Sequence, residues 1–210
     1  MDTDARIREL EAELRTLRSS KPRKKKALPR ILEPEQLSEV FSALPCGSST
    51  QKRDKAAIML MEWAGLRRRE IVNLRLRDVT FGDVTTIRVP DLPGCKTGAR
   101  TVPVSNRHPG HQALQEWLSL RPDSEWLFCS HKGTQLAAQQ LWRVLNASCV
   151  SIGLTWVHPH TLRHTAASRW LSEGYTLADV QMMLGHSSPS STIWYLHANP
   201  VHLVERARRV

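Results

Sequence analysis

The chain lacks the features that mark secreted, membrane-bound and zinc-binding proteins. No apolar run in its 210 residues is long enough to span a bilayer, and its first residues are charged, unlike a signal peptide. Its four cysteines, Cys46, Cys95, Cys129 and Cys149, form no Cys-x-x-Cys pair, which is typical of reduced thiols and not of a zinc site. We therefore expect a soluble cytoplasmic protein with no membrane contact and no metal.

Acidic residues are also scarce relative to basic ones. The chain holds 30 Lys and Arg against 20 Asp and Glu, which gives a net charge of +10. Residues 1–30 contain ten of the basic and five of the acidic residues, and so carry half of the excess. This balance favours a polyanion such as DNA as partner, although a solvated basic surface would show the same composition.

Residues 2–18 are expected to form a charged helix. Its apolar residues follow the 3-4-3 spacing of a coiled-coil seam: Ile7, Leu10, Leu14 and Leu17. Two heptads are short for a coiled coil, and an isolated helix of this length is marginal in water. The segment is therefore either a small dimerisation helix or a helix docked on its own domain.

Residues 19–30 are expected to form a linker, because they contain two prolines and six basic residues. The functional interpretation is a basic arm that lies along DNA phosphates, with an affinity that falls steeply with salt. Its central residues are Arg23, Lys24, Lys25 and Lys26. The alternative is a solvated tether without a partner.

Residues 31–210 are expected to form one domain of mixed α+β structure, predominantly α-helical. Apolar faces predict helices over residues 34–44, 52–64, 109–120 and 136–150. Alternating β-branched residues predict strands over residues 78–81, 85–89 and 100–104, in a small three-stranded antiparallel sheet. Five tryptophans are expected to fill the core: Trp117, Trp126, Trp142, Trp156 and Trp170.

Three motifs follow one another in the last third of the chain. They are His160-Thr161-Leu162-Arg163-His164, then Leu184-Gly185-His186, then Tyr195 nine residues beyond His186. Their order and spacing resemble the tyrosine recombinase, or phage integrase, family, where the pattern reads H-x-L-R-H, L-G-H and a tyrosine. Upstream, Ala64-Gly65-Leu66-Arg67 with Glu70 resembles T-G-L-R-x-x-E. Residues 96–104 resemble K-T-G-x-x-R-x-V-P-L, with one residue fewer before the arginine.

The resemblance covers residues 31 to 197 and implies a tyrosine recombinase catalytic domain, without the core-binding domain that usually precedes it. It implies cleavage and rejoining of DNA through a 3′-phosphotyrosyl intermediate. The residues that it assigns to catalysis are Arg67, Lys96, His160, Arg163, His186 and the nucleophile Tyr195. It gives supporting roles to Glu70 and His164, and we expect Arg68, Arg69 and Arg100 to bind DNA.

These residue types suit the exchange of a phosphodiester. A phenol has an ordinary pKa near 10, so Tyr195 needs a base, for which His160 is the candidate. Arg67 and Arg163 would clamp two phosphate oxygens with paired hydrogen bonds, and His186 would donate another. Lys96 would protonate the leaving 5′-oxygen. Because these groups already balance the charge of the transition state, no metal or other cofactor is required.

Two other functions remain open from the sequence. A type IB topoisomerase-like enzyme would relax DNA with related chemistry, and a DNA-binding regulator would keep the fold without the reaction. We expect double-stranded DNA as partner, with self-association through the seam of residues 2–18 and through a C-terminal helix over residues 200–209. A second recombinase or an accessory protein is a further candidate partner. Tyr175, the only other tyrosine, is expected to have no catalytic role.

Overall fold

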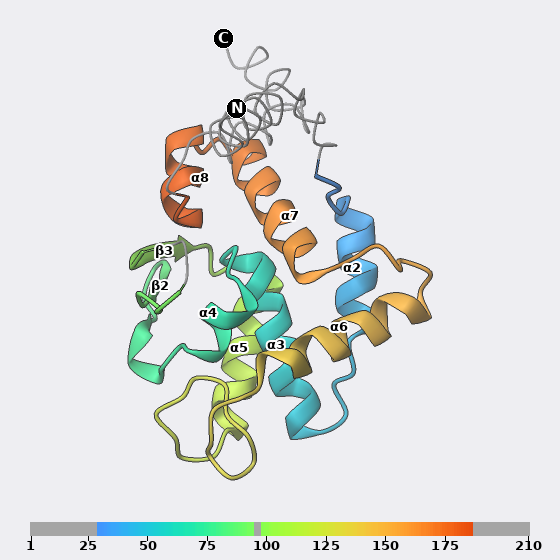
Figure 1. The fold of residues 1–210 in the computed structure, drawn as a ribbon, viewed down its shortest axis with the longest axis vertical. Helices are drawn as coiled ribbons and strands as arrows, with labels where there is room; N and C mark the ends of the chain where they lie inside the picture. The colour runs from blue at the N-terminus through green and yellow to red at the C-terminus, as the bar shows by residue number, and fades with distance from the viewer. Residues whose placement is uncertain (1–28, 95–97, 187–210) are drawn as a thin grey trace, which may run out of the picture.

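The computed structural model describes residues 29–94 and 98–186. Its helices are α2 (Pro34–Ala43), α3 (Ser49–Trp63), α4 (Arg68–Val72), α5 (Pro109–Leu120), α6 (Ala138–Ser151), α7 (Pro159–Ser172) and α8 (Leu177–Leu184) (Figure 1). A 3₁₀ turn, η1 (Leu76–Asp78), precedes the strands β1 (Val79–Thr80), β2 (Thr85–Val89) and β3 (Arg100–Val104). The expected fold, mainly helical with one small three-stranded antiparallel sheet, is confirmed.

Three predicted features lie outside the described residues: the helix of residues 2–18, the basic residues 23–26 and the helix of residues 200–209. Within the described ranges, no helix has the length and apolar character needed to cross a bilayer.

The starts of the first two described helices follow from their capping residues. Helix α2 has Pro34 in its first turn, and Gln36 reaches back to accept a hydrogen bond from the backbone N–H of Glu33 at 3.2 Å. Helix α3 begins three residues before the predicted start, because Ser48 and Gln51 form a reciprocal capping box. The polar first turn of α3 carries no apolar periodicity, so the pattern alone placed its start too late.

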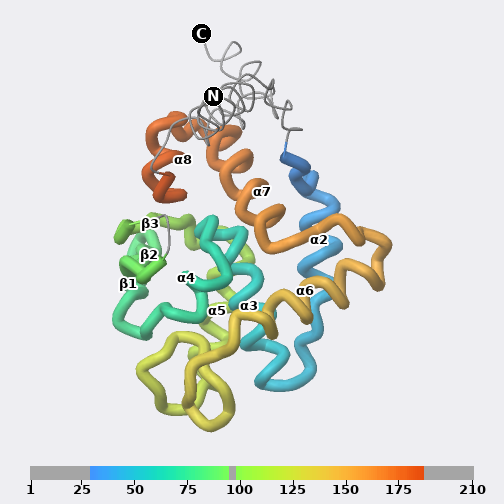
Figure 2. Tube along the Cα trace, in the orientation of Figure 1, coloured from blue at the N-terminus to red at the C-terminus, as the bar shows by residue number. Residues whose placement is uncertain are grey.

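Helix α3 lies at the centre of the molecule, between α5, α6 and α7 (Figures 1 and 2). Ten of its fifteen residues are buried, and Ile58, Leu60, Met61 and Trp63 are fully so. Of the tryptophans predicted to fill the core, Trp117 and Trp170 are buried, and Trp126 and Trp156 pack against the core while partly exposed. Trp142 is only half-buried.

The sheet has the strand order β1-β2-β3 with both pairings antiparallel. Strands β2 and β3 have the predicted bounds, and Ile87 pairs with Val102 on the buried face. Strand β1 is shorter than predicted, since Asp78 belongs to η1, where its carboxylate accepts from the backbone N–H of Arg75 at 2.9 Å. The sheet brings the start of β3 beside the end of α8.

Candidate active site

One buried carboxylate, that of Glu70 on α4, gathers three arginines, of which one is three residues away and two come from distant parts of the chain. Its side chain is 1% exposed. Arg100 of β3 donates from Nη1 to Oε1 and from Nη2 to Oε2, both at 2.9 Å. Arg67 donates its backbone N–H to Oε2 at 2.8 Å and places its Nη1 3.7 Å from Oε1. Nη1 of Arg163 lies 3.8 Å from Oε2. We call these four residues the arginine–carboxylate cluster.

The arginines keep the central carboxylate ionised. Burial by itself raises the pKa of Glu70, but the hydrogen bonds and the charge of Arg100 act in the opposite direction and outweigh it, so the pKa is lowered. Glu70 was expected to have a supporting role, and its bonds to the Arg67 backbone and to Arg100 fit that role. Arg100 was expected to bind DNA. In the structure its side chain is 5% exposed and turned inward onto Glu70, because the carboxylate takes both ends of its guanidinium group.

Arg163 holds the segment before α4 from within helix α7. Its side chain is 3% exposed, and Nη1 donates to the carbonyl oxygen of Gly65 at 2.7 Å. Gly65 has a φ of +61°, and a Cβ built there would lie 2.7 Å from Cη2 of Trp170. Only glycine accommodates both the left-handed backbone and this contact, so the Gly65-Leu66-Arg67 turn is closely fitted against α7.

Two arginines also fix the C-terminal end of α8. Nε of Arg100 donates to the carbonyl oxygen of Met183 at 2.7 Å, and Nη2 of Arg163 donates to that of Leu184. These carbonyls are left without helical partners at a helix end, so the guanidinium groups complete their hydrogen bonding. Gly185, with a φ of +66°, then turns the chain out of the helix and brings His186 to the cluster.

Three histidines surround the arginines and are held in the neutral form. Burial lowers the pKa of His160, and the charges of Arg163 and Arg67 lower it further. Burial together with the charge of Arg163 lowers the pKa of His186 to about 4. Burial lowers the pKa of His164 to about 4, with smaller effects from His160 and Arg163. At neutral pH each ring therefore offers one acceptor nitrogen and one donor nitrogen.

The structure thus brings together Arg67, Glu70, His160, Arg163, His164 and His186. Lys96 and Tyr195 lie outside the described residues. Arg68 is half-buried, with Nη1 3.5 Å from Oε1 of Gln139 on α6, while Arg69 is exposed. Tyr175 is 39% exposed in the turn between α7 and α8. The described residues contain no group of three His, Cys, Asp or Glu side chains suited to hold a metal.

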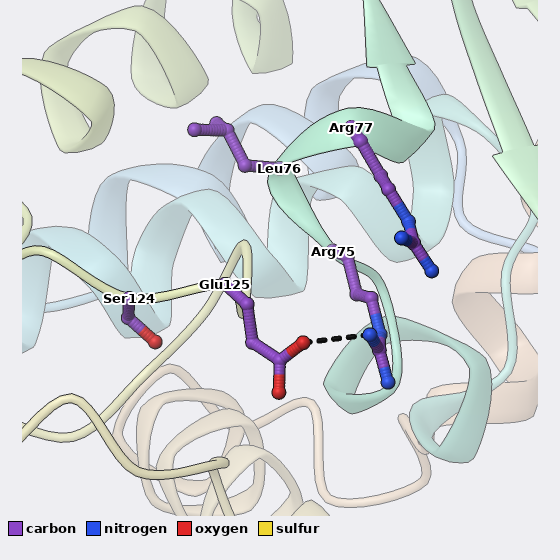
Figure 3. Close-up of a pocket in the computed structure, with 5 residues that line it drawn as sticks. All are labelled: Arg75, Leu76, Arg77, Ser124 and Glu125. Atoms are coloured by element: carbon purple, nitrogen blue, oxygen red, sulfur yellow. Dashed lines mark ion pairs between the residues drawn. The ribbon is translucent and has the colours of Figure 1, made fainter.

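A separate pocket of about 350 Å³ lies between η1 and the loop after α5 (Figure 3). Arg75, Leu76, Arg77, Ser124 and Glu125 line it, and Arg75 forms an ion pair with Glu125 at 2.6 Å. None of the residues of the arginine–carboxylate cluster lines this pocket. The pocket is therefore separate from the arginine–carboxylate cluster.

A model of the phage integrase family matches residues 30–202, and the chain belongs to that family. Tyrosine recombinase XerC 1 of Ralstonia nicotianae is 33% identical over 202 residues, a match that covers 88% of this chain and 61% of that protein. Tyrosine recombinase XerC of Oceanobacillus iheyensis is 34% identical over 194 residues, which covers 88% of this chain and 62% of that protein. The chain therefore spans about three fifths of the length of these relatives.

Solved structures share the fold. The XerH site-specific recombinase bound to palindromic difH substrate, in a post-cleavage complex, superposes with a TM-score of 0.73 at 25% identity, over 88% of this chain and 55% of that one. The XerA recombinase superposes with a TM-score of 0.71 at 26% identity, over 90% of this chain and 66% of that one.

Proposed function

We propose that this chain is the catalytic part of a site-specific tyrosine recombinase, which cuts and rejoins double-stranded DNA without a metal or high-energy cofactor. The observation that carries the proposal is the convergence of Arg67 and Arg163 on Glu70, beside the neutral rings of His160 and His186. Such a set of fixed donors suits a phosphodiester, whose transition state gathers negative charge on its non-bridging oxygens. A relative at 25% identity, XerH, has been solved in a post-cleavage complex with its substrate.

In the proposed reaction, the phenolic oxygen of Tyr195 attacks phosphorus and its proton passes to His160. The bond between phosphorus and the 5′-oxygen breaks, and that oxygen takes a proton from Lys96. The product is a 3′-phosphotyrosyl ester and a free 5′-hydroxyl group. Attack by the 5′-hydroxyl of another strand reverses these steps and rejoins the DNA. Because one phosphate ester replaces another, no external energy source is needed.

The charge states of the site support these roles. The lowered pKa of His160 leaves the ring unprotonated at neutral pH, as a general base must be. The guanidinium group of Arg67, whose side chain is 27% exposed, would donate to phosphate. Arg163 uses one N–H of each Nη atom on the carbonyls of Gly65 and Leu184, and would act on the phosphate through its charge and its other N–H groups. His186, held neutral by burial and by Arg163, retains one N–H for a further hydrogen bond.

Covalent trapping of DNA tests the proposal. The chain is mixed with supercoiled plasmid and with fragmented genomic DNA, the reaction is quenched in denaturant, and protein-linked DNA is isolated and sequenced. Tyr195→Phe removes the nucleophilic oxygen, and Tyr175→Phe is the matched control at an exposed tyrosine. Adducts are expected with the wild type and with Tyr175→Phe, and none with Tyr195→Phe.

The other outcomes separate the alternatives. Adducts that persist in Tyr195→Phe would contradict the assigned nucleophile. Relaxed plasmid without recombinant joints would indicate a topoisomerase-like activity. Salt-sensitive DNA binding with no adduct in any sample would indicate a binding protein that has kept the fold.

The remaining regions have proposed roles in DNA binding and assembly. Residues 31–210 would form the catalytic domain, residues 19–30 the basic arm, and residues 2–18 a helix that pairs protomers. The guanidinium carbon of Arg30 lies 4.6 Å from the ring centroid of Trp156, and the backbone N–H of Leu32 donates to Oγ1 of Thr165 at 3.0 Å. These contacts support an arm that leaves the domain beside α7. Arg68 and Arg69 would add contacts to DNA from α4.

Self-association on DNA, as a dimer or tetramer, would use the seam of Ile7, Leu10, Leu14 and Leu17 together with residues 200–209. Sedimentation of the chain with and without DNA tests this assembly. A Leu10→Lys variant is expected to remain monomeric where the wild type forms dimers, because a charge in an apolar seam opposes pairing. If both chains are monomeric on DNA, a second recombinase or an accessory protein becomes the expected partner.

A further inference from the structure

A second buried carboxylate lies at the end of α3, five residues before Arg67. Glu62 is 0% exposed, and its carboxylate meets a histidine on one oxygen and an arginine on the other. Burial by itself raises the pKa of Glu62, but the hydrogen bond from His108 and the charge of Arg169 outweigh that effect, so the pKa is lowered. Glu62 is therefore an ionised group inside the protein, and it takes no part in the arginine–carboxylate cluster.

Arg169 binds the end of α3 from helix α7. Its Nε donates to Oε1 of Glu62 at 2.9 Å, and its Nη2 donates to the carbonyl oxygen of Trp63 at 3.1 Å. Its Nη1 donates to Oε1 of Glu173, one helical turn further along α7, at 2.8 Å. One planar side chain thus joins two helices through two hydrogen bonds and makes a third to Glu173 at the end of its own helix, a geometry that a lysine cannot reproduce.

His108 binds the same carboxylate from the start of α5. Its Nε2 lies 2.8 Å from Oε2 of Glu62, and its ring stacks on Trp63 with centroids 5.9 Å apart. Nδ1 accepts the backbone N–H of Gly110 at 3.0 Å, so the proton of the neutral ring is on Nε2, the nitrogen that faces Glu62. A Cβ built at Gly110 would lie 2.9 Å from this Nδ1, which explains the glycine. We call Glu62, His108 and Arg169 the Glu62 anchor.

The anchor and the arginine–carboxylate cluster hold the same short segment at two points. Arg169 holds Glu62 and the Trp63 carbonyl, while Arg163 holds the Gly65 carbonyl at 2.7 Å. These two arginines are six residues apart on α7, about 9 Å along the helix axis. Trp170, the residue after Arg169, packs against Gly65. The turn that presents Arg67 is therefore fixed from the side of α7 at both ends.

We propose that Glu62 and Arg169 are positioning residues that set the separation between Arg67 and Arg163, with His108 fixing the carboxylate. The full burial of Glu62 rules out contact of its carboxylate with DNA or with the reacting atoms, so Glu62 acts through the segment of residues 62–67. This inference rests on the proposed function, in which Arg67 and Arg163 grip one phosphate. A shift of about 1 Å between two catalytic groups lowers a reaction rate by about 100-fold.

Two substitutions of Arg169 test the inference. Arg169→Met removes all three hydrogen bonds but keeps most of the side-chain volume, and Arg169→Lys keeps the charge with a single donor nitrogen. The rate of adduct formation is measured in single turnover on a DNA fragment recovered by trapping, at a temperature where each variant is folded. The expected rates are about 100-fold lower for Arg169→Met and about 10-fold lower for Arg169→Lys, with DNA affinity within about 2-fold of the wild type.

A buried ion pair on the same helix provides the matched control. Asp54 is 4% exposed and accepts from Nε of Arg53 at 2.8 Å and from Nε2 of Gln140 at 2.9 Å. Its partners are on α3 and α6 and do not include the segment of residues 62–67. Asp54→Asn is therefore expected to lower the unfolding temperature while leaving the cleavage rate of the folded protein within about 2-fold of the wild type.

Hydrogen exchange provides a second measurement that does not depend on catalysis. Amides of residues 64–72 are expected to exchange faster in Arg169→Met than in the wild type or in Asp54→Asn. If Arg169→Met cleaves as fast as Asp54→Asn, or loses rate only through weaker DNA binding, the inference is overturned. If the wild type forms no adduct, the proposed function fails. In that case hydrogen exchange still tests the Glu62 anchor, because unchanged exchange of residues 64–72 in Arg169→Met would show that the anchor does not hold this segment.

Discussion

The Glu70→Gln substitution removes one buried negative charge and leaves the size of the side chain almost unchanged. Glutamine keeps one acceptor oxygen, but its NH₂ group would face a donor nitrogen of Arg100 in place of the second oxygen. Arg100 and Arg163, whose side chains are 5% and 3% exposed, would then lose the negative charge of Glu70. Breaking a buried ion pair by removing one partner costs about 3–5 kcal/mol. We expect a loss of stability in this range.

The loss of stability is measured by urea unfolding, with tryptophan fluorescence as the probe, because Trp63 and Trp170 are buried next to the affected segment. The urea concentration at the midpoint of unfolding should fall, while the slope of the unfolding free energy against urea concentration stays unchanged. Glu125→Gln is the control, since the Arg75–Glu125 pair of Figure 3 has side chains 37% and 56% exposed. That substitution is expected to cost less than about 1 kcal/mol. Equal losses for the two variants would refute the role assigned to the arginine–carboxylate cluster.

Three further predictions concern pH, the glycine turn and the basic arm. The pKa of His164 is about 4 in the folded chain and 6.5 in its ordinary state, so the unfolded chain binds more protons between these values. Stability should therefore be full above pH 6.5 and decline as pH falls toward 4, and His164→Gln should reduce that decline in thermal unfolding. Gly153→Ala places a side chain at a φ of +77° with open space around it, and should lower the free energy of unfolding by about 1–2 kcal/mol. Gly65→Ala should lower it by about 1–3 kcal/mol more, because its Cβ would also collide with Trp170. Equal losses for the two variants would contradict the close packing of Gly65 against Trp170. Replacing the four basic residues 23–26 with alanine should lower the slope of log affinity against log salt by about 0.9 for each lost phosphate contact, and an unchanged slope would indicate a solvated tether.

The sequence was sufficient for those parts of the fold that depend on local patterns. Strands β2 and β3 have the bounds predicted from their β-branched alternation, and α5 begins and ends where its apolar face does. The errors fall where side chains at the ends of elements decide the outcome. The Ser48 cap lengthens α3, and the Asp78 carboxylate makes a 3₁₀ turn from the predicted first residue of β1.

The residues of the candidate site could be predicted from the sequence, but the hydrogen bonds and ion pairs that connect them could not. Motif spacing identified the residues at the cluster, and Arg67 with Glu70 are three residues apart, within reach of a local prediction. The inward turn of Arg100 was missed, because its partner Glu70 lies 30 positions away. Glu62 and Arg169 lie 107 positions apart, so no periodicity connects them. The position of Glu62 in the apolar second half of α3, after the run from Ala56 to Met61, was the signal of a buried partner that the sequence offered.

The sharing of one carboxylate by three guanidinium groups has a consequence for the free protein. With the pKa values of the neighbouring histidines lowered, the cluster confines an excess of two positive charges in a small volume. Their mutual repulsion opposes folding when no anion is present. Sulfate or phosphate that binds only the folded chain should therefore raise its unfolding temperature, and the stabilisation should grow with the logarithm of the anion concentration above Kd. Under the proposed function, the same excess charge would supply part of the affinity for a phosphodiester.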